Sequence, residues 1–177
     1  MEVPLTPLEF MRRTRRLHAN REGVVDGADR WTYGDFFDRC DRWSSALVAL
    51  GVGQGDRVAY IAPNTHAQLE SFYAVPQLGA VLVPLNFRLV ADDFRYLIQH
   101  SGAKVVCASA DFLDAVDSIR DDLKGVNHCV ARDRHREGGQ APAIRQGAGA
   151  QQGLADLDPD LDGGTVDTPR RSVREPS

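Results

Sequence analysis

The chain has 177 residues, a length that suits one domain with a real core and is short for two. Its 25 acidic and 21 basic residues give a net charge of −4, which excludes a strongly basic nucleic-acid-binding surface. No apolar run approaches the roughly 20 residues of a membrane span. The arginines at positions 12 to 16 precede no apolar segment of the kind found in secretory signals, so we expect a cytoplasmic protein.

The cysteines agree with that expectation. Cys40, Cys107 and Cys129 are odd in number, and their spacing fits neither a zinc site nor a redox pair. We therefore expect reduced thiols in the core. The five histidines form no spaced set of ligands, so no metal site is predicted.

The first 50 residues predict two helices with a hairpin between them. A helix is expected over residues 7–19, and strands over 24–26 and 31–33 flank a turn. Thr32, with Asp35 three residues later, resembles a capping box and should begin a helix that runs to residue 50. Gly51 is well placed to end it in the left-handed conformation.

From residue 57 to residue 130, strands and helices alternate. The expected strands are 57–61, 81–84, 104–108 and 127–130, and the expected helices are 65–78, with Asn64 or Thr65 as cap, 91–100 and 111–123. This alternation predicts the α/β class, with a mostly parallel sheet and helices on both of its faces.

Residues 131–177 have a different character. They contain no aromatic residue and no lysine, and glycine pairs and prolines interrupt their few apolar side chains. Such a segment buries too little to offset the entropy lost on ordering. We therefore expect two regions: a folded domain over residues 1–130 and a low-complexity tail over residues 131–177, disordered or out of frame.

Two loops are candidates for binding. The glycines of 51–56 follow a helix and precede a strand, the reverse of a dinucleotide fingerprint, so a structural turn tethered by Asp56 is expected there. Asn86 and Arg88 follow the strand 81–84, where ligands gather in open α/β sheets. Arg88 could bind a phosphate or carboxylate, or the loop could be purely structural.

Taken in order, these residues resemble the N-terminal portion of the adenylate-forming (AMP-binding) acyl-CoA synthetases. The resemblance covers roughly residues 4–130 and rests on the whole set, since no single piece is specific. The matching pieces are Trp31-Thr-Tyr33, Ala46-Leu47, Leu50-Gly-Val52, Gly55-Asp-Arg-Val-Ala59, Asn64, Gly79-Ala80, Val83-Pro-Leu-Asn86, Arg88-Leu89, Tyr96 and Ile98.

The resemblance implies a ligase that joins a carboxylic acid to CoA through an acyl-adenylate, with ATP, Mg²⁺ and CoA required by the full-length enzyme. The family's Thr-Ser-Gly-Thr-Thr-Gly-x-Pro-Lys loop is absent, and the only lysines are Lys104 and Lys124. No catalytic, cofactor-binding or metal-binding residue is therefore carried over, and no cofactor is expected for this chain alone. Arg88 is the single candidate, because the family places it near the substrate and CoA.

The leading hypothesis is a fragment of such a synthetase without ligase activity of its own. The alternative is a non-catalytic interaction module, or half of a split synthetase that complements a separate chain. Its partners would be the missing remainder of the enzyme or another copy of itself, and not nucleic acid. A third, weaker hypothesis is a small nucleotide-binding protein of doubly wound fold. The acyl substrate is not predicted.

Overall fold

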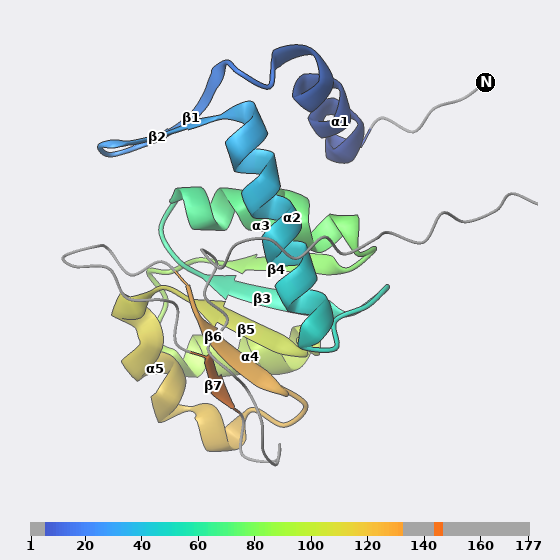
Figure 1. The fold of residues 1–177 in the computed structure, drawn as a ribbon. Helices are drawn as coiled ribbons and strands as arrows, with labels where there is room; N and C mark the ends of the chain where they lie inside the picture. The colour runs from blue at the N-terminus through green and yellow to red at the C-terminus, as the bar shows by residue number, and fades with distance from the viewer. Residues whose placement is uncertain (1–5, 133–143, 147–177) are drawn as a thin grey trace, which may run out of the picture.

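The computed structural model describes residues 6–132 and 144–146 of the chain (Figure 1). Within them, a helix, a hairpin and a long helix precede an α/β unit built on a five-stranded sheet. The helices are α1 (Pro7–His18), α2 (Tyr33–Ala49), α3 (His66–Gln77), α4 (Ala91–Ser101) and α5 (Leu113–Ser118). The strands are β1 (Glu22–Asp26), β2 (Asp29–Thr32), β3 (Arg57–Ile61), β4 (Val81–Leu85), β5 (Val105–Ala108), β6 (His128–Ala131) and β7 (Ile144–Gln146).

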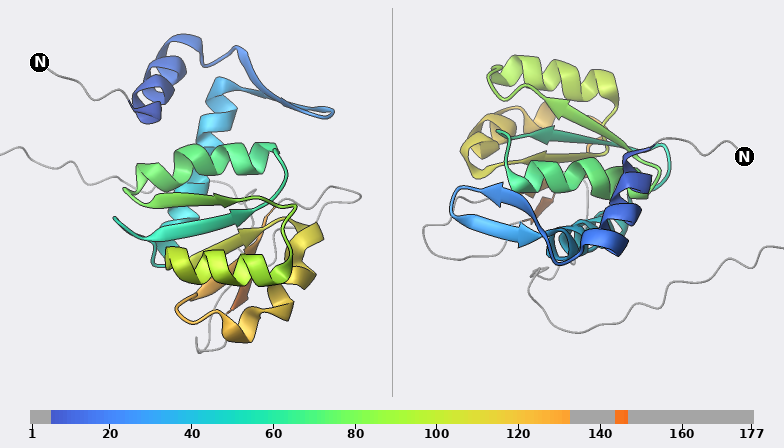
Figure 2. Two further views of the ribbon diagram at one scale, coloured as in Figure 1. Left: turned by 180° about the vertical axis from the view of Figure 1, so that it is seen from behind. Right: turned by 90° about the horizontal axis from the view of Figure 1, so that it is seen from above.

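The main sheet has the order β4-β3-β5-β6-β7. The first four strands are parallel, and β7 pairs antiparallel with β6. Helices α2 and α3 cover one face of this sheet, while α4 and α5 cover the other (Figure 2). The predicted α/β class, with a mostly parallel sheet and helices on both faces, is confirmed.

Local capping explains where the helices begin and end. Thr32 Oγ1 accepts a hydrogen bond from the backbone N–H of Asp35 at 3.1 Å and begins α2, as predicted. Thr65 caps α3 in the same way through the N–H of Gln68. Gly51 follows α2 with a φ of 77°, which glycine adopts without the penalty that a Cβ brings.

The helix expected over residues 111–123 is shorter in the structure. Only Leu113–Ser118 is α-helical, and 3-10 turns lie on either side of it. Aspartate recurs through this stretch and Ser118 lies within it, and both residue types compete with the backbone for hydrogen bonds. Ser118 Oγ donates to the carbonyl of Ala115 at 2.8 Å, at the point where the α-helix ends. The sequence therefore predicted a helix at the right place but too long.

The described part of the domain reaches past the expected boundary at residue 130. β6 continues to Ala131, which is buried, and Arg132 packs against the α2 and α3 side of the sheet. β7 also falls within the segment expected to form a tail. The remaining residues of 131–177 lie outside the described residues, so the prediction of a disordered or out-of-frame tail stays a prediction.

The turn over residues 51–56 joins a helix to a strand, as expected. Asp56 Oδ2 accepts the N–H of Gly53 at 2.8 Å and lies 3.1 Å from Lys104 Nζ. The Gly53 hydrogen bond and then the lysine lower the pKa of this carboxyl below its usual value. Asp56 therefore tethers the turn to β5.

Two further features concern the edge of the sheet and the length of the helices. β4 is an edge strand and contains the exposed Pro84. Among residues 6–132 and 144–146, no helix is long and apolar enough to cross a membrane.

Candidate functional site

The carboxyl ends of the parallel strands form the place where a site is expected in this fold. From β3 the chain passes to α3 on one face of the sheet, and from β5 it passes to α5 on the other. Chain segments therefore diverge between β3 and β5, and such a divergence is where open α/β sheets bind ligands. The loops that begin at Ala62, Asn86, Ser109 and Arg132 all leave from this edge.

Arg88 lies on the loop that follows β4, and it is exposed. Its backbone N–H donates to Asn86 Oδ1 at 3.1 Å, so Asn86 shapes the loop. The Arg88 guanidinium lies 5.3 Å from the centre of the Phe87 ring, and Phe87 packs against Phe112. The loop is thus held by local contacts, and its cation is available to solvent.

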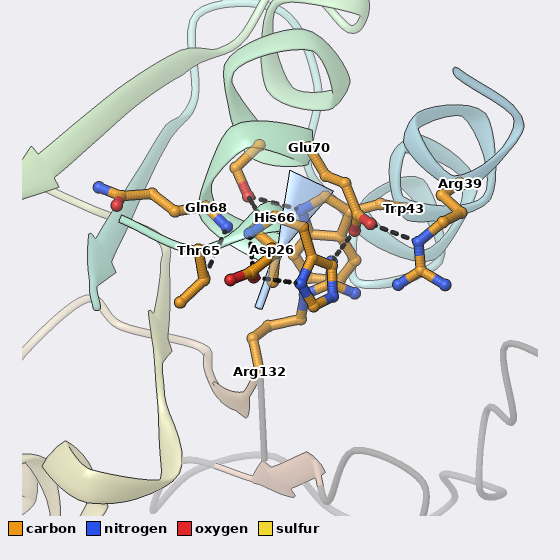
Figure 3. A network of polar contacts seen from close by, with 10 residues as sticks. Asp26, Arg39, Trp43, Thr65, His66, Gln68, Glu70 and Arg132 are labelled. Carbon is orange, nitrogen blue, oxygen red and sulfur yellow. Dashed lines mark hydrogen bonds and ion pairs between the residues drawn. The ribbon is translucent and has the colours of Figure 1, made fainter. Parts of the chain in front are cut away.

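A buried ionic cluster, missed in the sequence, lies on the α2 and α3 side of the same edge. Glu70 on α3 is only 1% exposed, and both of its carboxylate oxygens bind arginines (Figure 3). Arg39 Nε on α2 lies 2.5 Å from Oε1, and an Arg132 Nη atom binds Oε2. We call Arg39, Glu70 and Arg132 the arginine–glutamate cluster.

Trp43 on α2 completes the surroundings of Arg132. The Arg132 guanidinium lies 4.2 Å from the centre of the Trp43 ring, within the range of a cation–π contact. Trp43 Nε1 in turn donates to Ser71 Oγ at 3.1 Å. Burial disfavours the charge on Arg132, but Tyr60 and Glu70 outweigh it and raise the pKa of the guanidinium. Arg132 is therefore a permanent cation that joins the end of β6 to two helices.

A second set of contacts lies beside the arginine–glutamate cluster. The backbone N–H and Nδ1 of His66 lie 2.9 and 2.7 Å from Asp26 Oδ2, which joins the start of α3 to the hairpin (Figure 3). The His66 ring packs on Trp31 with centroids 4.5 Å apart, and Arg39 lies over the same indole at 5.6 Å. Arg39 thus connects the two sets.

The structure does not bring Arg88 together with the arginine–glutamate cluster. Arg88 follows β4, whereas Arg132 follows β6, and β3 and β5 lie between them. Three strand spacings separate the two positions, about 14 Å. The two arginines therefore do not form one anion site within the described chain.

The chemistry available at this edge is binding and tethering. Burial raises the pKa of the Cys107 thiol to about 12, and burial followed by the charge of Glu70 raises that of Cys40, so neither thiol ionises near neutral pH. In the described ranges, no group of three or more His, Cys, Asp or Glu side chains could hold a metal ion. A hollow beside α5 is lined by apolar residues and Asp117, which offers a phosphate no cation. This hollow therefore does not fit the phosphates of ATP.

Comparison with known proteins identifies the family of this chain. A family model described as AMP-binding enzyme matches residues 11–167, which is most of the chain. The chain belongs to the AMP-binding enzyme family. The match to this AMP-binding family runs through residues 131–167, which composition had set apart from the domain.

Two curated relatives and one solved structure illustrate the membership. The chain is 36% identical over 137 residues to a long-chain-fatty-acid–CoA ligase of Thermus thermophilus, covering 75% of this chain and 25% of that one. It is 37% identical over 110 residues to a peroxisomal benzoate–CoA ligase of Arabidopsis thaliana, covering 62% and 19%. A Mycobacterium tuberculosis fatty acyl CoA synthetase superimposes with a TM-score of 0.66 at 32% identity, covering 68% and 25%.

These coverages show how much of each relative the chain spans. It spans a quarter or less of the length of each of these three proteins. The predicted resemblance to the N-terminal portion of acyl-CoA synthetases is confirmed at the level of the family. The arginine–glutamate cluster had one signal in the sequence: Glu70 is the only acidic or basic residue, histidine aside, between His66 and Gln77.

Proposed function

We propose that this chain is the N-terminal part of an ATP-dependent acyl-CoA synthetase and that it has no ligase activity by itself. The supporting observation is the family match over residues 11–167 in a chain that spans 25% of the Thermus ligase. The family's phosphate loop is absent from the sequence, and the apolar hollow beside α5 offers no cation to the phosphates of ATP. ATP, Mg²⁺ and CoA therefore belong to the full-length enzyme in this proposal.

A turnover assay tests the proposal. The purified chain is incubated with ATP, Mg²⁺, CoA and a panel of fatty and aromatic acids, and pyrophosphate release is measured against the Thermus ligase as a positive control. We expect no release above the blank. Turnover by the chain alone would refute the claim of inactivity. Titration with ATP and AMP up to millimolar concentrations separates this proposal from a small nucleotide-binding protein, which would give a binding isotherm.

Arg88 is the candidate that we carry forward for contact with substrate or CoA in the full-length enzyme. Its exposed guanidinium at the carboxyl edge of the sheet supports this role. Arginine suits a phosphate or carboxylate because its planar group donates two parallel hydrogen bonds. In an assembled synthetase, Arg88→Ala should raise the KM for the acid substrate or for CoA. An unchanged KM for both would show that Arg88 contacts neither ligand.

The second candidate is half of a split synthetase, in which a separate chain supplies the missing remainder. It shares the first proposal's chemistry and differs in how the remainder is encoded. Co-purification with such a chain would support it. We place either form in the cytoplasm, in keeping with three cysteines that are buried and unpaired in the described residues.

A further inference from the structure

Helix α3 buries three polar side chains in its first half and exposes two large apolar ones beside them. Gln68, Glu70 and Ser71 are buried, whereas Leu69 and Phe72 are 39% and 45% exposed. Leu69 and Phe72 are the only exposed residues of this helix. A surface helix normally shows the opposite pattern, with polar residues toward solvent.

The other described α-helices also expose apolar side chains, for example Phe10 and Leu17 on α1 at 61% and 52%, but they expose charged side chains as well. Each exposes at least one charged residue: Arg13 on α1, Asp38 on α2, Asp92 on α4 and Asp114 on α5. On α3 the only acidic or basic residue besides the terminal His66 is Glu70, which lies in the arginine–glutamate cluster. The outward face of α3 therefore differs from every other helix face of the described chain.

The arginine–glutamate cluster also holds that face in place. Glu70 is bound from two sides, and Trp43 Nε1 donates to the neighbouring Ser71. Rotating α3 to bury Leu69 and Phe72 would break these contacts and leave buried charges unpaired, which is costly. The apolar face thus cannot turn inward.

We propose that Leu69 and Phe72 form a docking surface for the remainder of the acyl-CoA synthetase, which would cover α3 as a further layer. This inference rests on the proposed function. A helix that is apolar on its outer side as well as anchored on its inner side belongs in the interior of a larger protein. The relatives supply the occupant, since three quarters of the Thermus ligase has no counterpart in this chain.

The test compares one position in two settings. Residues 6–132 replace the matching stretch of the Thermus ligase in a chimera, and Phe72→Cys is labelled with a maleimide in the chain alone and in the chimera. Tyr96→Cys, an exposed aromatic position on α4 across the sheet, is the matched control. We expect Phe72→Cys to react at least about tenfold more slowly in the chimera, as for a group that reacts only after local opening, with Tyr96→Cys unchanged.

Equal rates for Phe72→Cys in the two settings would overturn the docking surface. The buried native cysteines report whether the chimera is folded, because they stay unlabelled only in an intact domain. Acyl-CoA formation is measured separately: an active chimera with reactive Phe72→Cys refutes the surface alone. A folded but inactive chimera with protected Phe72→Cys counts against the proposed function and leaves the surface standing.

A measurement on the chain alone keeps the proposal falsifiable if the chimera does not fold. Phe72→Glu should lower the fluorescence of an anilinonaphthalene sulfonate dye by about half or more, because such dyes bind exposed apolar patches. An unchanged signal would overturn the proposal. Concentration-dependent protection of Phe72→Cys in the isolated chain would assign the surface to a second copy instead and would also overturn it.

Discussion

The two faces of the main sheet are built by different means. On the α2 and α3 face, several buried polar groups are bonded to specific partners: Glu70 to two arginines, and Ser44 Oγ to the carbonyl of Ala74 at 2.8 Å. On the α4 and α5 face, the buried cluster consists of Ala, Ile, Leu, Phe, Val and Cys side chains. Directional bonds specify how a helix is turned, whereas apolar packing requires mainly shape and volume. The first face is therefore the one that sets orientation.

The sharpest test of this contrast is Glu70→Ala. It leaves two arginines facing each other at a buried position, and removing one partner of a buried pair costs about 3–5 kcal/mol. Urea denaturation should show a loss of about 3 kcal/mol or more. The control Glu22→Ala removes an exposed carboxylate 3.7 Å from Arg30 and should cost less than about 1 kcal/mol. Equal losses would erase the distinction between the buried cluster and a surface pair.

Ser71→Ala should have the next largest effect. It leaves the buried Trp43 Nε1–H without its acceptor, and an unsatisfied buried donor costs about 1–3 kcal/mol. Ser45→Ala is the control, because Ser45 is exposed and bonds only to a carbonyl of its own helix. Thermal and urea unfolding of the two variants should separate them. A Ser71→Ala protein as stable as Ser45→Ala would show that the bond is dispensable.

On the apolar face, Ile98→Val should cost about 1 kcal/mol. Ile98 is 1% exposed in the cluster formed with Phe94 and Val116, and the variant removes one methylene group without leaving a polar atom unpaired. The same urea experiment measures it. A loss of stability as large as that of Glu70→Ala would mean that the α4 and α5 face depends on its individual side chains as strongly as the α2 and α3 face does.

The smallest expected effect is a pH dependence from His128. By strand alternation its side chain lies on the same face as Val130, and burial followed by the charge of Lys104 lowers its pKa below the ordinary value of about 6.5. The unfolded chain then takes up the proton first as pH falls. Stability should therefore be full above pH 6.5 and fall below it, until the folded pKa is reached. His128→Gln should flatten that part of the profile, and an unchanged profile would exclude His128 as its source.

Much of the fold was predictable because it depends on local signals. Thr32 and Thr65 cap the helices that follow them, and Gly51 ends the helix before it. The order of strands and helices could be read along the chain because each is a short continuous segment. The arginine–glutamate cluster was not predictable in this way. Arg39 and Arg132 lie 31 and 62 residues from Glu70, and pairing over that distance depends on the assembled sheet. Arg88 was placed correctly at the strand end, but its role stays a prediction.

Pro84 disfavours association of this chain with other molecules through the edge strand β4. Within the described residues, no strand pairs with the outer edge of β4, and unpaired edges invite strands from other molecules. Proline has no N–H, so the outer row of donors on β4 is interrupted at Pro84, the fourth of its five residues. A strand added there would lose a hydrogen bond at that point. Two nascent copies on one polysome that met along this edge would therefore pair less stably than two strands with an uninterrupted row of donors.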